Sequence, residues 1–310
     1  MLIRPAACLV LLFAPMGALA QEEPNLSVSL MQSTFMLEGQ TPTGVTVGTG
    51  FLLMRPLAGS PENTGHTTGE FVLITAAHVL QGMTGDTAVI HLRGHDPSHN
   101  WIEVPARFKI RTPGGAPIWK RHPDADIAVM YISLPFNPIE TVVPTTLLAD
   151  DKLLQQYKMG PGVELNCLGY PLGDRGIAGF PILRTGVVAS YPLLPTKTTK
   201  SFLFDFRVFE GNSGGPVYFE QQDLRGSIGT CCGARFIVGL VTDETVYKTP
   251  PGQTEPYAGV RVQQLSIGWV VHASLIAETI NLLPSPELPE SREMMVPVEL
   301  TPVAPPQNGR

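Results

Sequence analysis

Short apolar runs, each closed by a glycine or proline, recur along most of the chain. They are rich in valine, isoleucine, leucine and phenylalanine, and turn-forming residues separate them. Runs of this length and composition predict about twelve β-strands rather than helices. Clear examples are GVTVGTGFLLM (44–54), FVLITAAHVL (71–80), DIAVMYISLP (126–135) and RFIVGLVTD (235–243).

One late segment departs from this pattern. From about Gln264 to Leu282 the apolar residues recur at helical spacing, which predicts a C-terminal α-helix. The β part that precedes it is too long for one small barrel. The sequence therefore predicts an all-β fold with two barrels followed by a helix.

The two ends of the chain have compositions of their own. Residues 1–20 combine Arg4, a short apolar run and the small-residue ending Ala18-Leu19-Ala20, which is typical of a secretory signal peptide. The apolar run is short for a membrane anchor. Residues 284–310 contain seven prolines and scattered glutamates, so we expect a disordered Pro-rich tail.

The overall charge narrows the range of partners. The formal net charge is −6, and no basic patch occurs, so we expect no nucleic-acid partner. With the signal peptide removed, we expect no membrane association and an exported protein, either periplasmic or secreted. Three cysteines then remain, an odd number that excludes a disulfide-dense scaffold.

The stretch FEGNSGGPVYF (209–219) contains a candidate nucleophile, Ser213. Three interpretations are open: an ordinary tight turn, the G-x-S-x-G elbow of an α/β hydrolase, or the serine of another acyl-transfer site. An elbow requires a histidine late in the chain and alternating helices. His272 is the only histidine after Ser213, and it lies in the predicted helix, so the elbow is excluded.

A base and a carboxylate precede Ser213 in the chain. His78 follows an apolar strand and three small residues, and Asp126 directly precedes another apolar strand. Asp124 is an alternative carboxylate, but it is separated from that strand. The order His, Asp, Ser is that of the chymotrypsin arrangement, whereas subtilisin has the order Asp, His, Ser.

Taken together, the motifs resemble those of a trypsin-like serine peptidase of the chymotrypsin fold, in the bacterial HtrA-like branch but without a PDZ domain. The resemblance covers about residues 27–282. The motifs that carry it are GTGF (48–51), TAAH (75–78), DIAV (126–129), LGYPLG (168–173), GNSGGPV (211–217) and IVGLVTD (237–243).

The resemblance implies a fold of two antiparallel six-stranded β-barrels with a C-terminal α-helix. The N-terminal barrel would cover residues 27–145 and carry the catalytic histidine and aspartate. The C-terminal barrel and the helix would cover residues 146–283 and carry the catalytic serine. The active site would lie in the cleft between the barrels.

The resemblance also implies the roles of the site residues. Ser213 would attack the peptide carbonyl, His78 would act as the base and then the acid, and Asp126 would orient the imidazole. The backbone N–H groups of Gly211 and Ser213 would form the oxyanion hole. Thr242 would support the aspartate.

Substrate binding is less well defined by the sequence. By family spacing, Arg207 would lie at the base of the specificity pocket, where it could favour acidic P1 residues or be neutralised by Asp205. The substrate-binding strand would run through Thr242 and Asp243. We therefore expect protein or peptide substrates, with the preferred residue left open.

Two departures from the family are informative. Asn212 stands where digestive relatives have an aspartate that pairs with a newly formed N-terminus, so we expect activity without zymogen cleavage. Cys167 would lie in the same barrel as Cys231 and Cys232, and a disulfide with either is an alternative to three buried or free thiols.

The function predicted from the sequence is an exported serine endopeptidase, monomeric by default, with no cofactor and no metal. The spacing of His91, His95 and His99 suggests a metal site, but a solvated loop explains it better. Two alternatives remain: a non-catalytic binding or chaperone module on a protease fold, and an esterase on the same fold.

Overall fold

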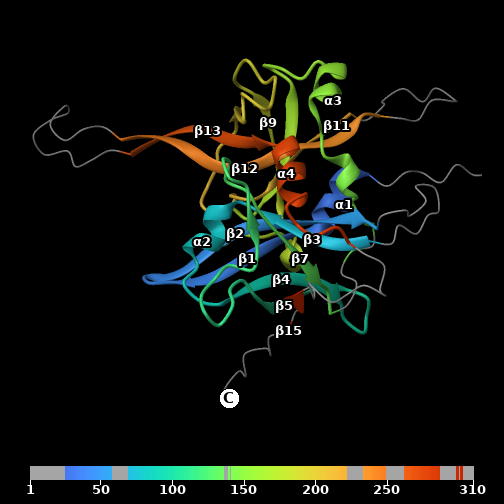
Figure 1. The fold of residues 1–310 in the computed structure, drawn as a ribbon, viewed down its shortest axis with the longest axis vertical. Coiled ribbons are helices and arrows are strands. Elements are labelled where there is room, and N and C mark those ends of the chain that lie inside the picture. The colour runs from blue at the N-terminus through green and yellow to red at the C-terminus, as the bar shows by residue number, and fades with distance from the viewer. Residues whose placement is uncertain are drawn as a thin grey trace, which may run out of the picture.

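The chain folds into two β units that lie against each other, with the first unit below and the second above in Figure 1. The signal-peptide prediction, Cys231 and Cys232 fall outside the part of the chain that is described. This computed structural model describes residues 25–57, 69–135, 139, 141–221, 233–248, 262–286, 298–299 and 301–302.

The first unit is a sheet whose six main strands lie in the order β7-β3-β2-β1-β4-β5, each antiparallel to its neighbour. A short strand, β6, pairs with β7. The bounds are β1 Thr34–Thr41, β2 Gly44–Pro56, β3 Gly69–Thr75, β4 Thr87–His95, β5 Trp101–Lys109, β6 Lys120–Arg121 and β7 Ala128–Ser133.

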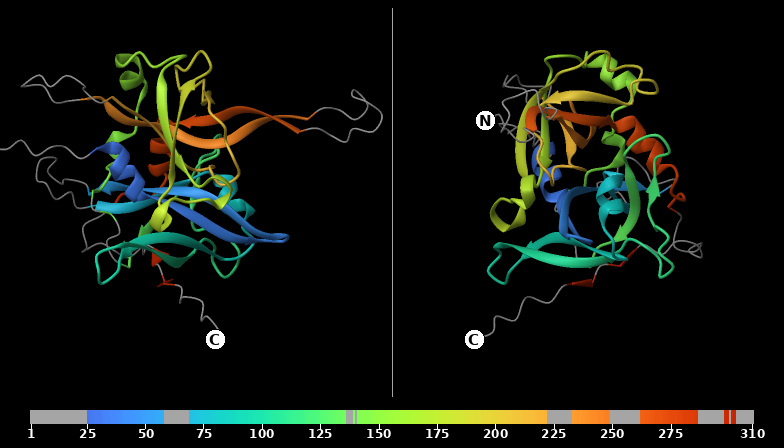
Figure 2. Two further views of the ribbon diagram at one scale, coloured as in Figure 1. Left: turned by 180° about the vertical axis from the view of Figure 1, so that it is seen from behind. Right: turned by 90° about the vertical axis from the view of Figure 1, so that its left-hand side faces the viewer.

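The second unit is a closed barrel of six strands in the order β10-β13-β12-β11-β8-β9. The long strands β12 and β13 also extend beyond the barrel as a projecting ribbon (orange in Figures 1 and 2). The bounds are β8 Glu164–Gly169, β9 Ile182–Val188, β10 Ser201–Asp205, β11 Pro216–Glu220, β12 Arg235–Lys248 and β13 Val262–His272. The predicted all-β, chymotrypsin-like class with a C-terminal helix is confirmed.

Helices are few and short. The α-helices are α1 Leu26–Ser33, α2 Ala77–Gly82, α3 Asp151–Gln156 and α4 Ala273–Ile280, and the 3-10 turns are η1 Thr145–Leu147, η2 Pro171–Gly173 and η3 Ile177–Gly179. Asn25 and Asp150 cap α1 and α3, because their side chains accept hydrogen bonds from the backbone N–H groups of Val28 and Leu153. Among the described residues, no helix is long and apolar enough to cross a membrane.

The predicted helix from Gln264 to Leu282 is wrong over its first half. That part is β13, which pairs with both β10 and β12, and only Ala273–Ile280 is helical. A short apolar run fits either a strand or a helix. This part of the chain is a strand because its backbone forms hydrogen bonds with β10 and β12, which a local pattern does not reveal.

Four residues of the predicted Pro-rich tail lie in short strands. β14, Val298–Glu299, pairs in parallel with β7, and β15, Thr301–Pro302, pairs antiparallel with β5. These strands extend both edges of the first sheet and, together with β6, bring its six main strands to nine. An edge strand offers unpaired backbone groups to any extended segment, however little that segment can bury.

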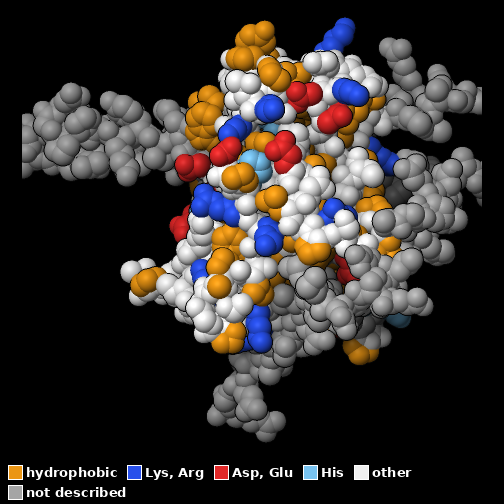
Figure 3. All heavy atoms as spheres, viewed as in Figure 1, with side chains coloured by type: hydrophobic (Ala, Val, Ile, Leu, Met, Phe, Trp, Pro, Cys, Tyr) orange, Lys and Arg blue, Asp and Glu red, His pale blue; other side chains and the backbone are white. Residues whose placement is uncertain are grey.

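Each unit encloses an apolar core, formed for example by Phe35, Phe51 and Ile74 in the first and by Phe204, Val217 and Ile237 in the second. On the face shown in Figure 3, acidic and basic side chains are interspersed with apolar ones. The cores make both units rigid supports for the loops that meet between them.

Candidate active site

Strand pairing in the first unit brings His78 and Asp126 together. His78 lies in the first turn of α2, three residues after Thr75 ends β3, and Asp126 lies two residues before Ala128 begins β7. Thr75 and Ala128 are paired across the β3–β7 ladder. Two residues separated by 48 positions therefore start from adjacent strand ends.

The carboxylate of Asp126 receives two hydrogen bonds from His78. Its Oδ2 lies 2.5 Å from Nδ1 of the imidazole, and its Oδ1 accepts from the His78 backbone N–H at 2.9 Å. Burial alone would raise the pKa of Asp126, but the hydrogen bonds and charge of His78, with the charge of Arg121, outweigh it and lower that pKa. An ionised Asp126 fixes the tautomer in which Nδ1 carries the proton and Nε2 is a free base.

The alternative carboxylate, Asp124, faces elsewhere. It is exposed and accepts a hydrogen bond from Nζ of Lys200 at 2.9 Å. This hydrogen bond lowers the pKa of Asp124. Asp126 is thus the carboxylate that contacts His78.

Ser213 lies in a tight loop between two glycines with positive φ. Gly211 has φ +94° and Gly214 has φ +90°, a region that favours glycine. A Cβ on Gly214 would lie 2.0 Å from the carbonyl oxygen of Thr49 and 3.0 Å from the nitrogen of Ala76, two residues before His78. The serine loop therefore packs directly against the strand end that carries the histidine.

The hydroxyl of Ser213 does not bond to His78 in this structure. Its Oγ donates to the carbonyl oxygen of Thr242, at 3.2 Å. Serine is free to change rotamer, and catalytic hydrogen bonds in unliganded enzymes are often absent or long. The structure brings the three predicted residues to one region but shows a hydrogen bond only between His78 and Asp126.

Thr49 holds the serine loop in place, and the sequence analysis did not assign it this role. It is fully buried in β2, and its backbone N–H donates to the carbonyl oxygen of Ser213 at 2.8 Å. Its Oγ1 donates to the carbonyl oxygen of Gly211 at 2.6 Å. The only signal in the sequence was a hydroxyl residue between Gly48 and Gly50 in an apolar strand.

The orientation of the Glu210–Gly211 peptide bears on the expected oxyanion hole. The Glu210 carbonyl accepts a hydrogen bond from the backbone N–H of Leu172 at 2.6 Å. In a trans peptide the N–H points opposite to the carbonyl, so the Gly211 N–H points away from Leu172. Within the described residues, the N–H groups of Gly211 and Ser213 have no hydrogen-bond partner.

The residues expected to bind substrate have different environments. Arg207 is exposed, with its guanidinium 4.8 Å from the ring centre of Phe209. Thr242 is buried, and its hydroxyl donates to the carbonyl of Trp269 at 3.4 Å. Asp243 is exposed on β12, opposite Trp269. Their roles in specificity stay predictions.

Two further predictions concern a disulfide at Cys167 and a solvated loop that contains His91. Cys167 is a buried free thiol in β8, and burial raises its pKa to about 12. Its two predicted disulfide partners lie outside the described residues. His91 is not in a solvated loop as expected. It is buried on β4 between Glu38 and Glu103, and no metal-binding group of three such side chains occurs in the described ranges.

A search of curated proteins found no match. Several solved protease structures are similar at low identity: a serine endoprotease from Yersinia pestis (11% identity, 84% of this chain and 67% of that chain covered, TM-score 0.41), the protease Anisep from Arthrobacter nicotinovorans (11%, 82% and 96%, 0.44) and a protease from M. tuberculosis in its active form (16%, 93% and 96%, 0.41).

The match to a family profile is more direct. The profile of the trypsin-like peptidase domain matches residues 48–226, more than half of the chain. The matched range contains His78, Asp126 and Ser213. The chain belongs to the trypsin-like peptidase domain family.

Proposed function

We propose that this protein is an exported serine endopeptidase that cleaves peptide bonds through His78, Asp126 and Ser213. The observation that carries the proposal is the His78–Asp126 pair, whose imidazole has its Nδ1 bound to a carboxylate. A serine hydroxyl is a weak nucleophile until such an oriented base removes its proton. A Cβ on Gly214, the residue after Ser213, would lie 3.0 Å from the backbone nitrogen of Ala76, two residues before His78, and this close approach supports Ser213 as the proposed nucleophile.

In the proposed reaction, Ser213 turns its hydroxyl from the Thr242 carbonyl to Nε2 of His78. His78 takes the proton while Oγ attacks the substrate carbonyl, and Asp126 stabilises the imidazolium. The N–H groups of Gly211 and Ser213 donate to the oxyanion. The imidazolium then protonates the leaving amine, and water, activated by the same histidine, hydrolyses the acyl-enzyme.

A fluorophosphonate probe tests the nucleophile. The mature protein beginning at Gln21 should be labelled within minutes, and Ser213→Ala should not be labelled at all. Because Asn212 provides no carboxylate for a newly formed N-terminus, no further cleavage should be needed. Labelling that survives in Ser213→Ala, or that requires an N-terminal cut, would contradict the proposal.

The same protein can be tested for the two alternative functions by probe labelling, ester hydrolysis and peptide cleavage. A binding or chaperone module on this fold would bind unfolded protein without reacting with the probe. An esterase would react with the probe and hydrolyse activated esters, but would leave a peptide library intact. Cleavage of the library, with its P1 preference, identifies an endopeptidase and tests Arg207.

A further inference from the structure

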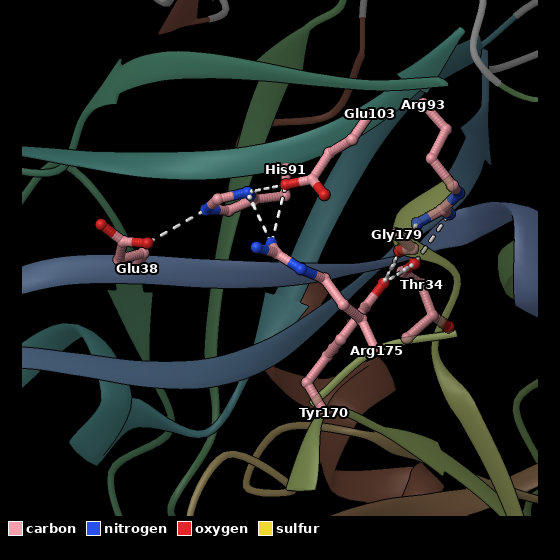
Figure 4. A network of polar contacts seen from close by, with 8 residues as sticks. All are labelled: Thr34, Glu38, His91, Arg93, Glu103, Tyr170, Arg175 and Gly179. Atoms are coloured by element: carbon pink, nitrogen blue, oxygen red, sulfur yellow. Dashed lines mark hydrogen bonds and ion pairs between the residues drawn. The ribbon is translucent and has the colours of Figure 1, made fainter. Parts of the chain in front are cut away.

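A fully buried arginine joins three elements that are far apart in the sequence. Arg93 lies on β4 with no exposed surface, and the four N–H groups of its Nη1 and Nη2 atoms make five hydrogen-bond contacts, so one hydrogen is shared between two acceptors. Three of the contacts go to the chain at the end of α1, and two go to the connection between β8 and β9 in the second unit; Figure 4 shows those to Thr34, Tyr170 and Gly179. The acceptors are Met31 O (2.9 Å), Gln32 O (2.8 Å), Thr34 O (2.8 Å), Tyr170 Oη (3.0 Å) and Gly179 O (3.1 Å).

Every one of these acceptors belongs to a neutral group. The carbonyls at the end of α1 carry the partial negative charge of a helix C-terminus. The rings of Phe35 and Phe180 each lie 4.5 Å from the guanidinium carbon, where cation–π attraction adds to the stabilisation. The planar fork of arginine, unlike a lysine ammonium, reaches both groups of acceptors at once.

The segment held by Arg93 runs from Tyr170 to Phe180 and is called here the 170s loop. It contacts the peptide that would form the oxyanion hole. Leu172 N–H donates to Glu210 O at 2.6 Å, and a Cβ on Gly211 would lie 2.2 Å from Tyr170 O. The position of the Glu210–Gly211 peptide therefore depends on the 170s loop.

The 170s loop needs support from outside. Leu172 and Ala178 both have φ +56°, an unfavourable region for residues with a side chain. A second contact with the first unit comes from Arg175, which donates to Glu103 Oε1 at 2.7 Å, beside buried His91 (Figure 4). Both contacts tie the loop to the sheet of the first unit.

The other end of α1 is anchored to the second barrel. The carboxylate of Glu220, at the end of β11, accepts hydrogen bonds from the N–H groups of Leu26 and Ser27, at 2.6 and 3.0 Å. The helix therefore spans from the strand after the serine loop to Arg93. Asn212 is neutral, so it cannot order the site through an ion pair.

We propose that Arg93 is a positioning residue for the proposed peptidase reaction. Through Tyr170 and Gly179 it holds the 170s loop in the shape in which Leu172 orients the Glu210 carbonyl. The Gly211 N–H then points toward the developing oxyanion without an ion pair at position 212. The inference rests on the proposed function, because it assigns the arginine to that reaction.

Two variants test it by steady-state kinetics on a peptide that the wild type cleaves. Arg93→Met removes all five hydrogen bonds, and Tyr170→Phe removes only the hydroxyl. Losing one oxyanion donor costs about 10²–10³-fold in kcat, so we expect a loss of that order for Arg93→Met and about tenfold for Tyr170→Phe. KM should stay within about threefold, and affinity for a peptidyl aldehyde should fall in parallel with kcat/KM.

Arg55→Met is the matched control. Arg55 also donates to carbonyls at a helix end, those of Ile280 in the last turn of α4 and Leu283 just after it, and within the described residues none of its hydrogen bonds reaches the 170s loop. It should lower the melting temperature and leave kcat unchanged at 20 °C below that temperature. If Arg93→Met and Tyr170→Phe behave in the same way as Arg55→Met, Arg93 is only structural and the inference is wrong.

The failures of the two proposals are distinguishable. A wild-type protein that neither cleaves peptides nor reacts with the fluorophosphonate refutes the proposed function. A wild type that does both, beside a Tyr170→Phe variant with unchanged kcat and aldehyde affinity, refutes the inference alone. If Arg93→Met fails to fold, the kcat and the aldehyde affinity of Tyr170→Phe alone test the inference.

Discussion

His272 should make the stability of this protein fall as the pH drops from neutral to weakly acidic. Its ring is fully buried at the end of β13, 5.0 Å from the ring of Phe202, and within the described residues neither ring nitrogen has a hydrogen-bond partner of good geometry, although the Leu193 backbone lies near enough to weaken the pKa shift. Burial lowers the pKa of His272 from 6.5 to about 4, although the charge of Asp151 and the Leu193 carbonyl oppose the shift.

The magnitude follows from proton linkage. Between pH 6.5 and 4 the unfolded chain binds a proton that the folded ring does not, so the free energy of unfolding decreases as the pH falls. At 1.36 kcal/mol per pKa unit, the full effect is about 3 kcal/mol, with about 2 kcal/mol already lost at pH 5. Above pH 6.5 both states are neutral, and the loss disappears.

Urea unfolding of the wild type and of His272→Leu from pH 8 to pH 5 measures this effect. Leucine has a similar volume and cannot bind a proton, so the variant should gain about 2 kcal/mol relative to the wild type over that range. His99→Asn, a change of an exposed histidine with positive φ, is the control for removing a histidine from the surface rather than from the core.

A constant difference between His272→Leu and the wild type would refute the reasoning, since it would mean that the folded ring binds a proton as readily as the unfolded one. The wild type provides a second check that needs no variant. Its His272 ring resonances should not titrate between pH 7.5 and 5 in the folded protein.

Three further predictions concern the site and the tail. Asp126→Asn should retain the fold and lose about 10⁴-fold in kcat, because the wrong imidazole tautomer is favoured. Asp124→Asn should lose far less, and equal losses in the two variants would contradict the assignment of Asp126 as the catalytic carboxylate. Thr49→Val removes the donor to Gly211 O and should destabilise the protein by about 1–3 kcal/mol in urea unfolding while lowering kcat; an unchanged kcat would show that the loop keeps its shape without it. Truncation after Pro286 removes β14 and β15 and should reduce amide-exchange protection in β5 and β7, and unchanged protection there would mean that the tail contributes nothing to the sheet.

The sequence by itself was enough to predict the class of the fold and the order of the candidate site residues. Short β-branched runs between glycines and prolines favour strands, and this signal is local to each run. The order His78, Asp126, Ser213 and the spacing of their motifs are properties of the chain alone. That order excluded the α/β-hydrolase and subtilisin arrangements before any geometry was available.

The tertiary structure decided everything that depends on a distant partner. Val262–His272 is a strand because β10 and β12 satisfy its backbone, and two short tail segments are strands because β7 and β5 leave edges unpaired. Thr49 and Arg93 look ordinary in the sequence, since a threonine or an arginine within a strand is usually solvated. Only folding surrounds them with buried carbonyls from distant segments, and such carbonyls require donors because water cannot reach them.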